Sequence, residues 1–435
     1  MTRRSAEIRE ALGHPVIDSD GHVIEFMPLV RDLMAQDAGP ELAAKFAAAA
    51  ASPSVLTRVG AKSRRNLNVM RPPWWALAAS SLDRATAMLP RLLRSRLDEL
   101  GLDFSFVFPT FGMLALHVPD AEIRTAAARA FNRYAVEVFS DVRDRIEPVA
   151  CVPAYAPDEA LAAIEDAVDG LGLKSVVLTG LVPRTSRPDQ LPNAFDGIGY
   201  GTGHDFDPVW DACETRNLTP TFHTPGFGHG TRSSPESYMH NHVGGFASGA
   251  EAVARSLVFG GVPVRHQALR FGFMEGGVAW AVSLARDLVA HWQKRAGHAI
   301  DRFDPEHVDH RLIADLVEAY GSDAVRARAD GLPAALSNLS QPVADGDLVD
   351  EFAPSGIDAA DTIARIFRDQ FFAGCEADDP LTCLAFDERL GSGVGVLLGS
   401  DLGHWDAPDA TELLGEVWDQ VERGLLTEEQ VRRMT

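Results

Sequence analysis

The sequence predicts an α/β protein with a (β/α)8 TIM-barrel fold. Eight short apolar runs recur along the chain, each ending in Gly, Pro or a polar cluster, and longer segments of helical period separate them. Buried parallel strands read as continuous apolar runs, and their alternation with helices is typical of βαβ units. The runs are HPVIDSDGH, FSFVFPTFG, RIEPVACVPAY, LKSVVLTGL, LTPTFHTPG, LRFGFMEGG, QFFAGCEAD and GVGVLLGSD.

The segments between these runs carry helix signals. DEALAAIEDAVDGLG ends in the glycine that is expected at a helix C-terminus. Near the end of the chain, Thr427 and Gln430 form a plausible capping box for a short helix. The clearest helical spacing lies in residues 120–145, where it is formed by Ile123, Ala127, Phe131, Tyr134 and Val138.

Two segments are additional to the strands and helices of a minimal barrel. Residues of about 29–100, with RPPWW in the middle, form a long helical excursion between the first strand and the first barrel helix. Residues of about 297–360 form a polar insertion before the seventh strand. Because barrels with insertions can exceed 400 residues as one unit, we expect residues 1–435 to form a single domain. Trp74 and Trp75 either line a substrate pocket or pin the excursion to the barrel.

The composition of the chain limits the kinds of partner and compartment that we expect. The formal charge of −22, from 62 acidic and 40 basic residues, disfavours nucleic acid and anionic membranes. No apolar run reaches the ~18 residues of a membrane span, and the charged start of the chain does not resemble a signal peptide. Four cysteines without paired spacing suit a reducing compartment. We therefore expect a cytoplasmic enzyme with a small-molecule substrate, for which a homo-oligomer is compatible with the sequence.

Polar groups gather at the ends of four runs. The first run delivers Asp20 and His22, which alternation places on one face of the strand, with Glu25 shortly after. Taken singly, such residues have structural explanations, for example a core histidine, a helix cap or a partner for arginine. The carboxyl ends of barrel strands meet at one mouth, so the set together predicts a metal site. The other members are His223 on the fifth run, Glu275 on the sixth, and Asp401, His404 and Asp406 on the eighth.

These motifs resemble the amidohydrolase superfamily, in the amidohydrolase-related branch that includes aromatic-acid decarboxylases. The resemblance rests on DSDGH, FHTPG and GSDLGHWD, and on an E-G-G-x-x-W pattern matched at Glu275 and Trp280. It covers the chain from about residue 14 to the end. It implies a TIM barrel with one or two metal ions. The matching positions would make Asp20, His22, His223 and Asp401 metal ligands.

The departures from this family all move the site toward carboxylates. Asp20 replaces the first histidine of the usual H-x-H motif, and Glu275 stands where the decarboxylases carry a histidine. Lys174 lies at the wrong end of its strand to be the carbamylated lysine of some members. Carboxylate-rich sites suit iron or manganese better than zinc. With Glu25 and Glu275 as further ligands, the negative charge indicates two divalent ions. Iron is the preferred metal in this interpretation, with zinc or manganese as the alternative. His404, Asp406 or a loop histidine (His229, His240, His242) would complete the second site.

Two classes of reaction remain open. The favoured one is a non-haem diiron monooxygenase that hydroxylates an apolar substrate, because a resemblance to the diiron members of this branch, whose ligand set is similarly rich in carboxylates, accounts for both changes from histidine to carboxylate. Those members are thought to act largely on coenzyme A-linked substrates. The alternative is a Zn- or Mn-dependent hydrolase or carboxy-lyase, in which Asp401 or Glu275 is the general base. Catalytic roles are expected for Glu275, Asp401 and His404. A non-catalytic ligand-binding barrel is the third alternative.

Candidate substrate-binding residues are of two kinds. A rim for coenzyme A would need basic residues, and the densest basic run contains Lys62, Arg64, Arg65 and Arg71. A solvated helix face is the favoured explanation of that run. Four apolar residues are expected to form pocket walls near the metal, although such residues are also common in an ordinary hydrophobic core. These are Phe111, Met113, Phe227 and Met274.

Overall fold

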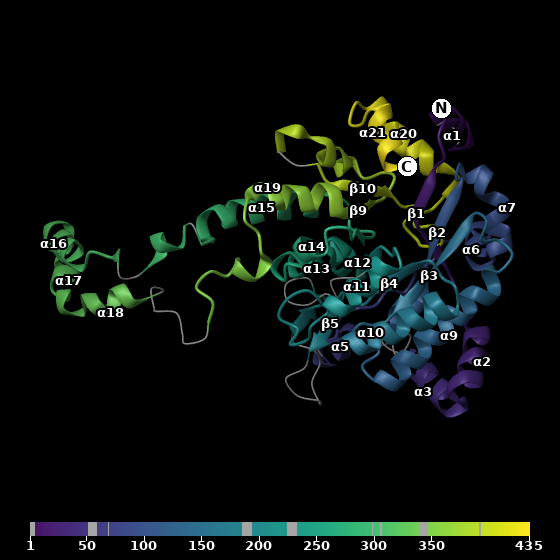
Figure 1. Cartoon of the computed structure of the whole chain (residues 1–435), viewed down its shortest axis with the longest axis horizontal. Coiled ribbons are helices and arrows are strands. Elements are labelled where there is room, and N and C mark those ends of the chain that lie inside the picture. The colour runs from purple at the N-terminus through teal and green to yellow at the C-terminus, as the bar shows by residue number, and fades with distance from the viewer. Residues whose placement is uncertain are drawn as a thin grey trace.

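The computed structural model describes residues 5–50, 59–67, 69–184, 194–223, 233–297, 299–304, 307–338, 347–390 and 393–435. Eight parallel strands form a nearly closed barrel in the order β1-β2-β3-β4-β7-β8-β9-β10 (Figure 1). Each predicted apolar run contains one of them, which confirms the predicted fold class. The strands are β1 (Ile17–Val23), β2 (Phe104–Pro109), β3 (Ile146–Val152), β4 (Ser175–Leu178), β7 (Pro220–Phe222), β8 (Phe271–Phe273), β9 (Phe371–Cys375) and β10 (Gly395–Leu398).

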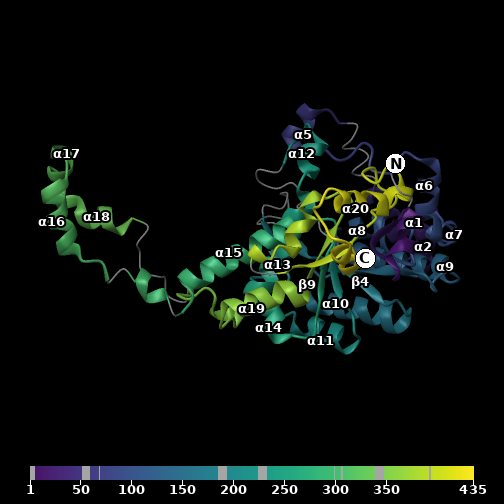
Figure 2. The same cartoon turned by 90° about the horizontal axis from the view of Figure 1, so that it is seen from above.

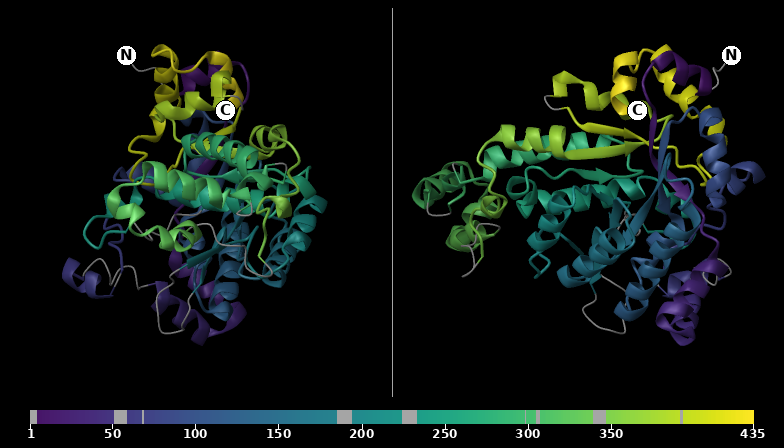
Figure 3. Two further views of the ribbon diagram at one scale, coloured as in Figure 1. Left: turned by 90° about the vertical axis from the view of Figure 1, so that its left-hand side faces the viewer. Right: turned by 45° about the vertical axis from the view of Figure 1, so that its right-hand side comes forward.

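Helices alternate with these strands around the barrel (Figure 3). They are α8 (Thr110–Ala115), α9 (Ala121–Phe139), α10 (Pro157–Ile164), α11 (Asp207–Thr215), α12 (Tyr238–His242), α13 (Gly245–Phe259), α14 (Val262–Arg265), α15 (Ala279–Arg295), α19 (Ala360–Arg365), α20 (Leu413–Glu422) and α21 (Glu428–Met434). Shorter π and 3-10 segments are η1 (Glu165–Gly170), η3 (Ile300–Phe303), η5 (Ala329–Gly331), η6 (Ala353–Ser355), η7 (Ile366–Gln370), η8 (Pro380–Phe386), η9 (Glu388–Leu390) and η10 (Ala410–Glu412). A small antiparallel hairpin, β5 (Leu181–Arg184) and β6 (Ala194–Gly197), follows β4.

Local capping explains where several helices begin. Asp120 precedes α9, and its side chain accepts a hydrogen bond from the backbone N–H of Ile123. At the other end of the chain, Thr427 and Gln430 form the predicted capping box of α21. The backbone N–H of Ile17 donates to the carbonyl of Thr435 over 2.9 Å, so β1 is tied to the end of the chain. Helix α1 (Ser5–Leu12), near the start of the chain, accordingly lies beside α20, near its end (Figure 1).

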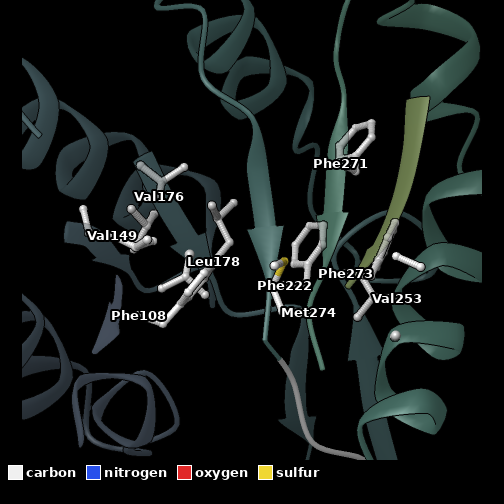
Figure 4. Close-up of a cluster of buried hydrophobic side chains, with 14 of the residues drawn as sticks. Phe108, Val149, Val176, Leu178, Phe222, Val253, Phe271, Phe273 and Met274 are labelled. Atoms are coloured by element: carbon white, nitrogen blue, oxygen red, sulfur yellow. The ribbon is translucent and has the colours of Figure 1, made fainter. Parts of the chain in front are cut away.

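Aromatic side chains fill much of the barrel core on the β7 to β9 side. Phe222 and Phe271 stack with ring centroids 6.5 Å apart, and Phe271 meets Phe371 edge to face at 5.7 Å. All three are buried, as are Phe273 and Met274 beside them (Figure 4). Met274, predicted as a pocket wall, therefore belongs to this core.

The first excursion is helical, as predicted. Its helices are α2 (Met27–Ala38), α3 (Pro40–Ala50), α5 (Ala61–Leu67), α6 (Ser81–Met88) and α7 (Pro90–Leu100), after a leading helix α1 (Ser5–Leu12). Helices α2 and α3 pack on α9 at the outside of the barrel. Between α5 and α6, residues 71–78 run without regular structure toward the carboxyl ends of the strands, and we call this segment the strap.

The second insertion forms an arm that projects away from the barrel (Figures 1 and 2). It leaves the end of α15 and contains α16 (His310–Tyr320), α17 (Asp323–Arg326) and α18 (Leu332–Ser337). None of its described residues between 301 and 349 is buried. The described part of the chain has no helix that is long and apolar enough to cross a membrane.

Candidate metal centre

Strand β1 aims two polar side chains into the barrel mouth. Asp20 and His22 are both buried, and the register with β2 shifts between Asp18 and Gly21. A Cβ atom on Gly21 would lie 2.6 Å from Oδ2 of Asp18 and 2.8 Å from Oγ of Ser105. The strand therefore needs glycine at this irregularity, next to the two predicted ligands.

The predicted ligands from four strand ends come together. His223 Nε2 lies 3.3 Å from Asp20 Oδ1, 3.3 Å from Glu275 Oε2 and 3.2 Å from His22 Nε2. His22 Nε2 also lies 3.1 Å from Asp401 Oδ1, and His404 Nδ1 lies 2.6 Å from the same oxygen. The side chains could thus offer donor atoms to one small volume, in two groups: Asp20, His22 and His223; and His22, Glu275, Asp401 and His404.

A third group adjoins the first two and shares Glu275. His242 on α12 and Asp406 in the loop after β10 complete it, with His242 Nε2 3.4 Å from Asp406 Oδ2. The hydroxyl of Tyr238 lies 3.1 Å from His242 Nδ1. The mouth therefore holds donor groups for a second cation next to the first.

Buried carboxylates in this cluster lack ordinary partners. Oxygen atoms of Asp20, Glu275, Asp401 and Asp406 are inaccessible to solvent and accept no hydrogen bond from the described residues. Burying a carboxylate without a donor or a counter-charge is costly. Glu275 and Asp401 also adopt left-handed backbone angles, with φ of 58° and 47°, which are rare outside glycine and concentrate at functional sites. A cation would remove the electrostatic cost.

The titration behaviour of the cluster has the same origin. Burial, followed by repulsion from Asp401 and Asp20, raises the pKa of Glu275 well above its ordinary value. Burial and the neighbouring imidazoles of His404 and His223 lower the pKa of His22. Burial opposes the charged form of His404, but the carboxylate of Asp401 outweighs it and raises the pKa of that imidazole. In the neutral state, His22 is a suitable metal ligand.

Glu25 lies outside the cluster, contrary to the prediction that it is a ligand. Its two carboxylate oxygens accept the backbone N–H groups of Phe111 at 3.0 Å and Gly112 at 2.9 Å, in the first turn of α8. A carboxylate in this position satisfies N–H groups that the helix leaves unpaired. Each oxygen accepts one of these hydrogen bonds, and Glu25 belongs to none of the possible ligand groups among the described residues, so its contacts assign it to the start of α8.

Asp18 has a similar structural role that the sequence analysis did not assign. It accepts hydrogen bonds from the hydroxyl groups of Ser105 at 2.7 Å and Ser400 at 2.8 Å, and from the Ser400 backbone. Burial raises the pKa of Asp18 to about 6. Close by, the backbone N–H of Asp401 donates to the carbonyl of Asp20 over 2.8 Å. Asp18 therefore joins β1 to the neighbouring β2 and to the loop after β10, where the barrel closes.

Two further polar residues stand at strand ends and could have been found by the same rule. Thr110 follows β2, and its Oγ1 lies 3.3 Å from His22 Nδ1 and 3.4 Å from His404 Nε2. Glu376 follows β9, where burial and then repulsion from Asp406 raise its pKa to about 8. Glu376 lines a cavity of about 330 Å³ together with His242 and Glu275. The loop histidine His240 is exposed, while His229 and Phe227 lie outside the described residues.

The basic run of the excursion fastens it to the loop after β7. Arg64 is buried, and its Nε donates to the carbonyl of Pro235 over 2.6 Å. Arg65 pairs with Glu236, and Arg71 Nη1 donates to the Glu236 carbonyl over 2.7 Å. Lys62 is exposed. The run is therefore more than a solvated helix face, because it holds the strap in place.

The strap lines a second cavity near the mouth. This cavity of about 600 Å³, which we call the strap pocket, contains the predicted Trp74 and Trp75. Trp74 is 72% exposed and Trp75 is 47% exposed, so Trp74 in particular makes few contacts that could pin the excursion to the barrel. Phe111 and Met113 pack against the core instead of lining it. The full lining is Arg71, Trp74, Trp75, Ser237, Tyr238, Met239 and Trp405.

Comparison with known proteins agrees with this fold. A dihydroxybenzoic acid decarboxylase from Polaromonas sp. JS666, solved with bound manganese and 2-nitroresorcinol, is 15% identical over 97% of this chain and 94% of its own, with a TM-score of 0.50. An amidohydrolase from Mycobacterium avium subsp. paratuberculosis K-10 is 18% identical over 81% of this chain and 73% of its own, with a TM-score of 0.49. The search of curated proteins found no match. The family model described as Amidohydrolase matches residues 95–434, and the chain therefore belongs to the amidohydrolase family.

Proposed function

We propose that this chain is a metal-dependent enzyme that holds two divalent cations at the barrel mouth and catalyses a hydrolase or carboxy-lyase reaction on a small molecule. The observation that carries the proposal is the set of buried carboxylate oxygens without hydrogen-bond donors, which faces histidine nitrogens at 2.6 to 3.4 Å. Membership of the amidohydrolase family supports this class of reaction.

The charges of the cluster favour two cations over one. Asp20, Glu275, Asp401 and Asp406 carry four negative charges when ionised, which two divalent ions would neutralise. One ion would be held by Asp20, His22 and His223. The other would be held by Glu275, His242 and Asp406, with Asp401 placed to contact either ion.

Such ions, when bound, polarise a carbonyl group and lower the pKa of a water molecule. The chain's own groups would then move protons. Asp401 is positioned to accept a proton as general base, because its buried carboxylate lies beside the imidazoles of His22 and His404. His404, whose Nδ1 contacts Asp401 at 2.6 Å, would return a proton to the leaving group. Glu275 would hold the metal and orient His223.

The excess of carboxylates favours a second candidate function. Iron accepts mixed oxygen and nitrogen ligands more readily than zinc does, so a diiron centre that uses dioxygen to hydroxylate an apolar substrate fits the donor set as well. The apolar strap pocket beside the centre agrees with such a substrate, with a coenzyme A-linked one as a variant of the same hypothesis. We rank it second because family membership supports hydrolysis.

Metal analysis tests the proposal. Protein purified without added metal should contain about two divalent ions per chain, and Glu275→Gln should lose at least one of them. Glu25→Gln is the matched control and should keep both ions, because Glu25 is bonded to α8. Retention of every ion by Glu275→Gln would contradict the proposal. Zinc or manganese with turnover under anaerobic conditions would favour the hydrolase or carboxy-lyase, whereas iron with dioxygen-dependent turnover would favour the oxygenase.

A further inference from the structure

We propose that the strap pocket binds the flat, multi-ring apolar body of the substrate and that Arg71 binds an anionic group on that body. This inference rests on the proposed function only in placing the reacting end of the substrate at the metal centre. Binding of the body itself needs no metal.

The strap is fastened at both ends across the barrel mouth. At one end, the backbone N–H of Arg71 donates to the carbonyl of Ser234 over 2.9 Å, and Asn241 Nδ2 donates to the Arg71 carbonyl over 3.2 Å. At the other end, the N–H of Ala78 donates to the carbonyl of Gly403 over 2.8 Å. The strap therefore links the loop after β7 to the loop after β10, and the aromatic residues between its anchors are held in place.

Tryptophan exposure on the strap is unusual. The side chains of Trp74 and Trp75 are 72% and 47% exposed, although tryptophan is highly buried on average. Their rings meet at 62° with centroids 6.1 Å apart, and the guanidinium of Arg84 lies 5.3 Å from the Trp75 ring. Two adjacent, exposed indole rings that are braced in this way offer apolar faces on which a flat ring system can pack.

The pocket adjoins the metal centre through Trp405. This residue lines the pocket and stands in the chain between His404 and Asp406. Its ring centroid lies 5.4 Å from that of His242. A molecule that packs against Trp405 would therefore place its near end beside the donor groups of the centre.

Size and charge define the class of molecule. A cavity of about 150 Å³ already accommodates one benzene ring, and the strap pocket measures about 600 Å³. It therefore suits several rings. Arg71 is the charged residue in its lining, and within the described chain no carboxylate forms an ion pair with it. The acidic residues Glu376, Asp378 and Asp379 line the cavity of about 330 Å³ instead, so an anionic group is attracted toward Arg71.

Fluorescence anisotropy with 1-pyrenebutyrate, its neutral counterpart 1-pyrenebutanol, and competition by decanoate tests this inference. The intact chain should bind pyrenebutyrate about tenfold more tightly than pyrenebutanol, and decanoate should compete poorly. Trp74→Ala should weaken the binding of both pyrene probes about tenfold. Arg71→Met should weaken pyrenebutyrate to the level of pyrenebutanol. Tyr320→Ala, which removes an exposed aromatic side chain on the arm, is the control and should bind like the unmodified chain.

Equal binding by Trp74→Ala and the unmodified chain would overturn the ring site, and so would decanoate binding as tightly as pyrenebutyrate. A preference for the anion that persists in Arg71→Met would overturn the role of Arg71. Metal content and far-UV circular dichroism are measured on the same samples. Probe binding by folded protein without metal would uphold the pocket and count against the proposed two-metal function, so the two failures are distinguishable.

Discussion

Two buried glutamates near the barrel mouth differ in what surrounds their carboxylates. Glu25 accepts hydrogen bonds from two backbone N–H groups at the start of α8. Glu275 Oε2 accepts none from the part of the chain that the structure describes, and it faces His223. The same residue type thus caps a helix in one place and offers a ligand atom in the other. The number of donors that reach each carboxylate decides the difference.

Glu25 should make stability depend on pH. Burial raises its pKa in the folded chain from 4.5 to about 7. Between these values the folded state keeps the proton while the unfolded state has lost it. The contribution of Glu25 to the free energy of unfolding therefore falls as pH rises from 4.5 to about 7, by up to about 3 kcal/mol. Urea denaturation at several pH values should show a shallower decline for Glu25→Gln. Parallel curves for the two proteins would contradict this prediction.

At the scale of elements, the excursion uses buried polar contacts to hold its helices together. Arg96 on α7 donates from Nη1 to Asp83 Oδ1 on α6 over 2.8 Å and to Thr86 Oγ1 over 2.7 Å. Both charged side chains of the pair are 7% exposed. The orientation of α6, which follows the strap directly, therefore depends on this ion pair.

Removing one partner of the Asp83–Arg96 ion pair should lower the free energy of unfolding more than replacing both partners by apolar residues. Asp83→Ala leaves the Arg96 guanidinium buried with less compensation, and we expect it to lower the free energy of unfolding by about 3–5 kcal/mol. Asp83→Leu combined with Arg96→Met should recover most of that loss, because neither apolar side chain needs a partner. Chemical denaturation of the single and double variants measures both effects. A double variant as unstable as Asp83→Ala would show that packing, not the unpaired charge, is responsible.

At the scale of the whole molecule, the barrel and the arm differ in how they are stabilised. The strands enclose a continuous apolar core, whereas the described arm residues between 301 and 349 are all at least partly exposed. The arm leaves and returns at one place, since a Cβ atom on Gly297 would lie 3.0 Å from Asp350 Oδ2. The barrel core and its mouth thus take no buried residue from the described arm.

Removal of the arm should therefore leave the barrel intact. Replacing residues 301–349 by a short Gly-Ser linker should change the melting temperature by no more than about 4 °C, because little apolar area is lost from the core. Metal content should stay unchanged. Differential scanning calorimetry and metal analysis check both expectations. Unfolding of the shortened chain, or loss of metal from it, would show that the arm supports the barrel.

Local pattern alone determined much of this protein. The eight strands could be predicted because a strand buried on both faces must be apolar along its length, as β4 and β9 are. The convergence of Asp20, His22, His223, Glu275 and Asp401 could be predicted as well, because parallel strands of one barrel end at one mouth. The capping box at Thr427 is also a purely local signal.

Only the tertiary structure decided the partners of long-range contacts. Glu25 is bonded to backbone groups 86 and 87 residues away, and Arg64 to a carbonyl 171 residues away. The periodicity of a sequence does not predict which loop a side chain contacts when that loop lies so many residues away. The destination of the strap and the separation of Glu25 from the ligand cluster therefore followed from packing. The physical reason is that local sequence sets backbone preference and burial, whereas the pairing of buried polar groups depends on where distant segments meet.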